Sequence, residues 1–146
     1  MTDAPRVLVV GGAGMLGRPV SRALVDAGYD VRVFMRSAQQ DGRLPDACTP
    51  IVGDVRQGDV LRQAIADVDA VHLSLNTPFS RKTSFDPDRD GTALVVEAAL
   101  ETSRPHITRL SALGAPEGRE AWWSVARKVE SDDLVLGSGL DATVVR

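Results

Sequence analysis

The closely spaced glycines near the N-terminus are the residues with the clearest chemical potential. Gly12, Gly14 and Gly17 match the spacing G-x-G-x-x-G, and Gly11, Gly14 and Gly17 also match G-x-x-G-x-x-G. Such a turn passes a strand tightly into a helix and brings bare backbone amides against a pyrophosphate, while the helix N-terminus adds a partial positive charge. A glycine turn without a ligand is the alternative. We expect the whole turn to bind a dinucleotide, through Gly11, Gly12, Ala13, Gly14, Met15, Leu16 and Gly17.

The residue that follows the next apolar run indicates which dinucleotide is bound. A carboxylate at the end of this second run would bind the 2′-hydroxyl of NAD, whereas a basic residue suits the 2′-phosphate of NADP. The sequence has Arg36 there, and Asp30 lies at the opposite end of the run. A guanidinium pairs with two phosphate oxygens. We therefore predict NADP as the cofactor, with NAD possible. A solvated arginine is the alternative, and Arg43 is a candidate second phosphate contact.

The apolar pattern predicts alternating strands and helices, and these elements would hold the candidate residues in place. Gly28 closes the first helix as a C-cap, and Asp86 begins the third as an N-cap with Pro87 next to it. We expect an α/β fold with a Rossmann-like, doubly wound parallel sheet, helices on both faces, and one NAD(P)-binding domain over residues 1–146. The predicted strands are 7–10, 31–35, 51–52, 70–75, 106–110 and 141–145, and the predicted helices are 14–27, 57–68, 87–103 and 122–136.

Length and composition exclude several other classes of protein. The 146 residues suffice for one core, and 43% apolar with 25% charged residues is typical of a globular domain. The formal net charge of −3 argues against binding nucleic acid through bulk positive charge. Cys48 is the single cysteine, no apolar run approaches the roughly 20 residues of a membrane span, and residues 1–6 show no secretory signal. We expect a cytoplasmic protein without a membrane anchor.

Metal and hydrolase sites are not expected from the sequence. His72 lies inside a predicted strand and is interpreted as a core or sheet-face histidine, and His106 has no partner at ligand spacing. There is no Cys/His cluster for a metal and no G-x-S-x-G nucleophile turn.

Several segments resemble the atypical short-chain dehydrogenases, and within them the NmrA-like group of NADP-sensing regulators and isoflavone- or quinone-reductase-like enzymes. They are residues 11–17, Gly53-Asp54-Val55, Asp69-Ala70-Val71 and residues 110–114. Lys128-Val129-Glu130 and residues 138–146 are similar to that group's last core helix and sixth strand. The resemblance covers nearly the whole chain, and it is specific for the cofactor fold but not for a substrate.

The resemblance implies roles for residues at the ends of the strands. Asp54, followed by Val55, corresponds to the acid that approaches the adenine, with a plain turn residue as the alternative. Ser111 matches a serine near the nicotinamide. The segment that would line the cofactor ribose is Ser74, Leu75 and Asn76.

One departure from the family concerns the catalytic pair Tyr-x-x-x-Lys, whose tyrosine delivers a proton. With Lys128 in the lysine position, Ser124 occupies the tyrosine position, and a serine hydroxyl is far too weak an acid for this task. Tyr29, the single tyrosine, lies at the end of the first helix. Lys128 is expected to bind a ribose hydroxyl or to act alone, with a surface lysine as the alternative. Lys128 and Ser111 are thus the candidate catalytic residues, and enzymatic activity stays an open question.

The second departure is length, because the family continues past the sixth strand into a region that builds the substrate pocket. A natural minimal domain and a truncated product are both compatible with a chain ending at Arg146. The first hypothesis is a cofactor-binding or redox-sensing module. The alternative is an NADPH-dependent reductase or epimerase for a small organic substrate, with the substrate lobe missing or supplied by a partner. A third is a fragment that holds no cofactor. Apolar surface left open would favour a homo-oligomer.

Overall fold

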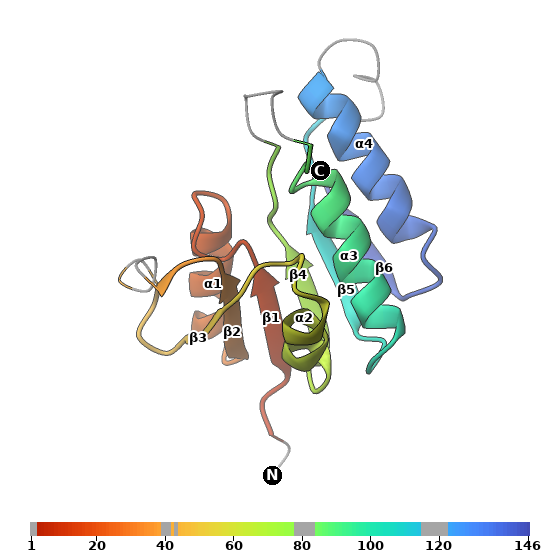
Figure 1. The fold of residues 1–146 in the computed structure, drawn as a ribbon. Coiled ribbons are helices and arrows are strands. Elements are labelled where there is room, and N and C mark those ends of the chain that lie inside the picture. The colour runs from red at the N-terminus through yellow and green to blue at the C-terminus, as the bar shows by residue number, and fades with distance from the viewer. Residues whose placement is uncertain (1–2, 39–41, 43, 78–83, 115–122) are drawn as a thin grey trace.

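The computed structural model describes residues 3–38, 42, 44–77, 84–114 and 123–146, excluding the side chains of 123 and 124. Its centre is a parallel six-stranded sheet with the order β3-β2-β1-β4-β5-β6 (Figure 1). The order reverses between β1 and β4, which creates the switch point of a doubly wound fold. The strands are β1 (Arg6–Val10), β2 (Asp30–Met35), β3 (Thr49–Val52), β4 (Ala70–Leu73), β5 (His106–Leu110) and β6 (Ala142–Val145).

Helices cover both faces of this sheet, as the sequence predicts. One cluster of apolar residues joins α1 to β1 and β2, and a second, larger cluster joins the other three helices to the opposite face. The predicted Rossmann-like architecture is therefore confirmed. The helices are α1 (Gly17–Asp26), α2 (Gly58–Ile65), α3 (Arg89–Leu100) and α4 (Trp123–Leu136).

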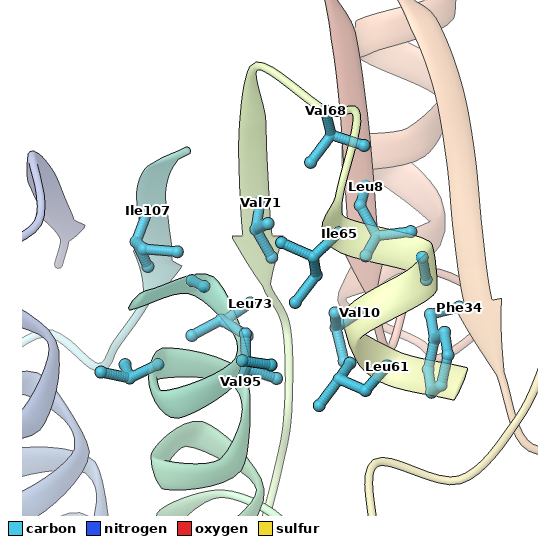
Figure 2. Packing of buried hydrophobic residues seen from close by; sticks show 14 of the residues in the cluster. Leu8, Val10, Phe34, Leu61, Ile65, Val68, Val71, Leu73, Val95 and Ile107 are labelled. Carbon is cyan, nitrogen blue, oxygen red and sulfur yellow. The ribbon is translucent and has the colours of Figure 1, made fainter. Parts of the chain in front are cut away.

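The core follows from the alternation of side chains along buried parallel strands. In β1, Val7 and Val9 face the α1 side, whereas Leu8 and Val10 face the side of α2 and α3. All four are buried, which is why the run is continuously apolar. Figure 2 shows the larger cluster, where side chains of α2 and α3 lie against those of β1 and β4. The central strands are thereby fixed, and their carboxyl ends meet at one edge.

The ends of several elements differ from those that the sequence pattern predicts, and the reasons are local. The first helix begins at Gly17 rather than residue 14, because the glycine turn occupies the residues before it. Gly28 ends that helix as predicted, with φ of 87° and its N–H donating to the carbonyl of Val25. β4 ends at Leu73, so residues 74–76 leave the sheet before the predicted strand end.

The start of α3 differs from the sequence prediction by two residues. The helix begins at Arg89, yet the Asp86 carboxylate accepts hydrogen bonds from the backbone N–H groups of Asp88 at 2.9 Å and Arg89 at 3.2 Å. The Asp86 carbonyl also accepts from the N–H of Asp90. The N-cap of α3 is therefore Asp88 and not the predicted Asp86, because residues 87 and 88 form a turn before the regular helix, and the Asp86 carboxylate binds the backbone of that turn.

Candidate functional site

A cavity of about 710 Å³ lies at the carboxyl ends of the strands, beside the switch point. Residues from the glycine turn, from the ends of β2 and β3 and from the segment after β4 line it, as do Phe34, Arg56, Thr77 and Phe85. Four residues of the turn, Gly12, Met15, Leu16 and Gly17, are not among its lining residues. The predicted cofactor residues that line it are Gly11, Ala13, Gly14, Arg36, Asp54, Val55, Ser74, Leu75 and Asn76.

Three glycines of the turn are required by packing alone. Gly11 has φ of 81°, and a Cβ there would lie 2.7 Å from the carbonyl oxygen of Ser74. A Cβ on Gly12 would lie 2.8 Å from the Val33 side chain. A Cβ on Gly17 would collide with the carbonyl oxygen of Gly11 and come within 2.6 Å of the Gly12 Cα. These glycines let the helix and strands approach each other, whatever the cavity holds.

Gly14 differs from the other three. It is exposed, and the nearest atom to a Cβ at this position would be the Gly11 carbonyl oxygen at 3.3 Å. Just beyond it, Leu16 forms the N-cap of α1 without a side-chain hydrogen bond to the helix. The first N–H groups of a helix have no intrahelical partners, and an anion satisfies them well. The Gly14 side of the turn therefore suits a phosphate.

Ser74 supplies a polar atom that the protein leaves without a partner. Its side chain is buried, it lines the cavity, and its hydroxyl has no hydrogen-bond partner among the described residues. Buried hydroxyl groups in proteins are nearly always hydrogen-bonded. A ligand with hydroxyl or phosphate oxygens would supply the missing bond, so this wall fits the ribose and phosphate part of a dinucleotide.

Two arginines and one carboxylate gather at the other end of the cavity. The Oδ1 atom of Asp54 accepts hydrogen bonds from the backbone N–H and the Nε of Arg56, both at 2.9 Å, and Oδ2 pairs with Nη2 at 2.6 Å. These bonds, with smaller contributions from the charges of Arg56 and Arg36, lower the pKa of Asp54 to about 2 despite the opposing effect of burial. The Arg56 guanidinium also lies over the Phe85 ring, 5.3 Å from its centroid.

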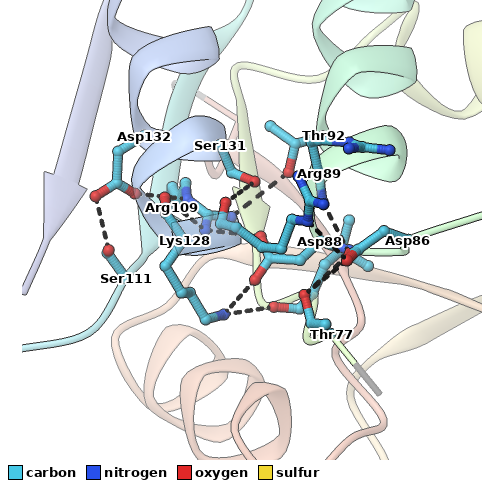
Figure 3. A network of polar contacts seen from close by, with 12 residues as sticks. Thr77, Asp86, Asp88, Arg89, Thr92, Arg109, Ser111, Lys128, Ser131 and Asp132 are labelled. Atoms are coloured by element: carbon cyan, nitrogen blue, oxygen red, sulfur yellow. Dashed lines mark hydrogen bonds and ion pairs between the residues drawn. The ribbon is translucent and has the colours of Figure 1, made fainter. Parts of the chain in front are cut away.

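The two candidate catalytic residues take part in buried polar contacts (Figure 3). The Nζ of Lys128 lies 2.7 Å from Oδ2 of Asp88 and donates to the carbonyl of Leu75 at 2.9 Å. The hydroxyl of Ser111 donates to Oδ2 of Asp132 at 2.7 Å. Neither Lys128 nor Ser111 is among the residues that line the cavity.

Arg109 connects these contacts into a single network. Its side chain is fully buried, with Nη2 2.7 Å from Oδ1 of Asp88 and Nε 2.8 Å from Oδ1 of Asp132. Arg146 adds a contact of 3.3 Å to Asp132. Asp132 lies four residues after Lys128, so both point from the same face of α4. We call Asp88, Arg109, Lys128 and Asp132 the buried ion network; it ties β5 to the start of α3 and to α4.

A family model described as NAD(P)H-binding matches residues 11–146. The chain belongs to this NAD(P)H-binding family. Over 103 residues it is 39% identical to the UDP-glucose 4-epimerase of Azospirillum brasilense, a match covering 64% of the chain and 30% of that protein. Over 145 residues it is 25% identical to the photosystem II assembly factor Ycf39 of Cyanophora paradoxa, covering 96% and 44%. The predicted resemblance to atypical short-chain dehydrogenases of the NmrA-like group is confirmed by these relatives. The chain spans less than half the length of both.

Solved structures show the same fold for this member of the NAD(P)H-binding family. A putative NAD-dependent epimerase/dehydratase of Bacillus halodurans superposes with a TM-score of 0.84 at 22% identity, covering 98% of this chain and 70% of that one. The enzyme WbmG of Bordetella bronchiseptica, in complex with NAD, gives a TM-score of 0.80 at 19% identity and covers 98% and 53%. At such identities the likeness shows the fold alone.

The histidines of this family member make hydrogen bonds within the sheet. Nδ1 of His72 lies 2.7 Å from the hydroxyl of Thr108, and burial lowers the pKa of His72 to about 4. Nε2 of His106 lies 3.0 Å from the hydroxyl of Thr143. The described part of the chain contains no group of three or more residues that could hold a metal ion. Within it, no helix is long and apolar enough to cross a membrane.

Sequence reasoning missed several residues that line the cavity of this NAD(P)H-binding domain, among them Arg56 and Phe85. The spacing of Asp54 and Arg56 was a usable signal, because an aspartate commonly binds the backbone two residues further on. Nothing in the sequence relates Phe85 to Arg56, since they come from different segments. Arg43 and the side chain of Ser124 lie outside the described residues.

Proposed function

We propose that this domain binds NADP(H), with NAD as the weaker ligand, and acts as a cofactor-binding or redox-sensing module. The observation that carries the proposal is one cavity lined by both the glycine turn and Arg36. The turn leads into a helix whose N-cap makes no side-chain hydrogen bond, and Arg36 is exposed at the end of β2. A phosphate-binding turn and a separate cation on one cavity suit a dinucleotide with an additional phosphate.

The other walls suggest how the remaining parts of the cofactor would be held. The backbone around Gly14 would bind the pyrophosphate, and the Ser74 hydroxyl would bind a ribose or phosphate oxygen. Asp54 and Val55 would face the adenine end, and Arg36 the 2′-phosphate. When bound, NADP(H) would supply hydride exchange at its nicotinamide, while the chain binds and orients it.

The contacts of the candidate catalytic residues favour binding over catalysis. Lys128 is paired with Asp88, and Ser111 donates to Asp132. A proton-transferring group must reach the substrate directly or through one water. Side chains engaged in such buried pairs are better suited to holding the fold.

A second candidate function is an NADPH-dependent reductase or epimerase, and one contact supports it. The ammonium group of Lys128 hydrogen-bonds the carbonyl of Leu75, a residue of the cavity wall. Lys128 therefore lies directly behind the cavity and could act on a ligand there after a small displacement. Turnover of NADPH with a carbonyl or quinone acceptor, lost in Lys128→Met, would establish this function.

Calorimetric titration with NADPH and NADH tests the main proposal. We expect tighter binding of NADPH, and we expect Arg36→Ala to weaken it by about 10- to 100-fold while changing NADH affinity less than about threefold, since a charge-assisted hydrogen bond contributes about 1.5–3 kcal/mol. Arg22→Ala, an exposed arginine of α1 outside the cavity, is the matched control. Tighter binding of NADH, or no binding of either cofactor, would contradict the proposal.

A further inference from the structure

We propose that Arg56 is a second residue that reads the 2′-phosphate, because its guanidinium neutralises Asp54 and offers further N–H donors to the phosphate. The inference rests on the proposed function, namely that the cavity holds NADP(H). It extends that function by naming a residue that sets the preference between the two cofactors.

The first argument is the position of Arg56 within the cavity. Arg36, Asp54 and Arg56 all line the same cavity, and the charge of Arg36 also reaches Asp54. Arg56 contacts Asp54 through Nε and Nη2. Its Nη1 group has no hydrogen-bond partner in the part of the chain that the structure describes. Since a guanidinium carries five N–H donors, Arg56 can hold Asp54 and a phosphate oxygen together.

The second argument is the charge balance at this end of the cavity. A carboxylate is ionised at neutral pH, so Asp54 without a cationic partner would repel a 2′-phosphate. Arg36 alone would only cancel the charge of Asp54. With Arg56, this trio of residues has a net charge of +1, which complements a phosphate carrying about −1.5 to −2 charges. Arg56 thus turns a neutral site into a cationic one.

The third argument is that Arg56 is already oriented. The Phe85 ring and the Asp54 carboxylate hold its guanidinium from two sides. The side chain is nevertheless 60% exposed, so a ligand can reach it. A guanidinium held in place loses less conformational freedom on binding a phosphate than a free one.

The test is a calorimetric comparison of NADPH and NADH binding to Arg56→Ala. We expect NADPH affinity to fall by about 10- to 100-fold and NADH affinity by less than about threefold, the size of a charge-assisted hydrogen bond to the additional phosphate. The double variant Asp54→Asn/Arg56→Ala should recover part of the loss, because it removes the unpaired carboxylate. Arg62→Ala is the control, since it breaks a partly exposed arginine–aspartate pair on α2, outside the cavity.

Circular dichroism of each variant checks the fold. Arg56→Lys keeps the charge but not the two-atom contact, so it should lose NADPH affinity to an intermediate extent. Equal losses for NADPH and NADH, or no loss, would overturn the role of Arg56 while leaving NADP(H) binding intact. A parent chain that binds neither cofactor would instead overturn the proposed function and this inference together. The two failures are therefore distinguishable in one set of titrations.

Discussion

The cavity at the strand ends and the buried ion network differ in how their polar groups are partnered. The cavity has Gly11 and Gly14 in its wall and a buried Ser74 hydroxyl without a partner among the described residues. The ion network is formed by long charged side chains, and Arg109 and Asp88 are fully buried in it. One region leaves polar groups open to a ligand, and the other satisfies them internally.

Under the proposed function, this difference separates residues that would bind the cofactor from residues that hold the fold. A buried charge is tolerated only when it is paired, and removing one partner leaves the other uncompensated. An open phosphate-binding turn has the reverse requirement, because its N–H groups must stay free of protein partners. We therefore expect charged residues on the α4 side to stabilise the domain, and the arginines after β2 and β3 to contact a ligand.

The largest expected effect comes from Arg109→Met. Among the described residues, this substitution leaves Asp88 paired with Lys128, and Asp132 with the Ser111 hydroxyl and the partly exposed Arg146. We expect the free energy of unfolding to fall by about 3–5 kcal/mol, the usual cost of breaking a buried ion pair from one side. Urea denaturation measures the loss. Arg62→Met breaks an exposed pair and should cost at most about 1 kcal/mol. Similar losses in both variants would show that the network does not hold the fold.

The next prediction compares two glycines of the same turn, Gly17 and Gly14. Gly17→Ala should lower the free energy of unfolding by about 3 kcal/mol, because the new methyl group meets backbone that cannot move aside. Gly14→Ala, where the nearest atom would be 3.3 Å away, should cost less than about 1 kcal/mol and yet weaken NADPH binding, since its methyl group lies on the exposed side of the turn. Unfolding curves and titrations separate the two variants. Equal stability losses would remove this distinction.

The smallest expected effect is the pH dependence of stability caused by His72, which lies in β4, the strand between the two regions. Since the pKa of His72 is about 4 when folded and about 6.5 when unfolded, its contribution to stability is present above pH 6.5 and is lost as pH falls toward 4. Between pH 6.5 and 5 we expect a loss of about 1–2 kcal/mol, measured by urea denaturation. His72→Gln should flatten this part of the profile. An unchanged slope in His72→Gln would contradict this account.

The fold was predictable because its signals are local. Val7 to Val10 form a continuous apolar run before glycines, and the period-3.6 pattern that follows can only be a helix packed on that strand. Element ends were less predictable, because they depend on contacts made by the folded chain. The strand predicted to run to residue 75 ends at Leu73, and residues 74–76 leave the sheet to line the cavity.

The cavity was predictable in part, since Gly11, Arg36 and Asp54 follow closely on strands whose carboxyl ends share one edge. The buried ion network was not predictable from the sequence. Arg109 lies in a strand between Thr108 and Leu110, and its partners Asp88 and Asp132 are 21 and 23 residues away in the chain. Such pairing follows from how α3 and α4 pack on β5, which no local pattern reports.

The most direct test of the contrast between the two regions is a ¹H–¹⁵N NMR titration of the chain with NADPH. The account predicts that amide shifts concentrate at residues 11–16, Arg36 and residues 54–56 and 74–76. Amides of Arg109 and of residues 131–132, within the ion network and on α4, should move little. Shifts centred on the network, or none at all at saturating NADPH, would contradict the assignment of binding to the cavity and of stability to the network.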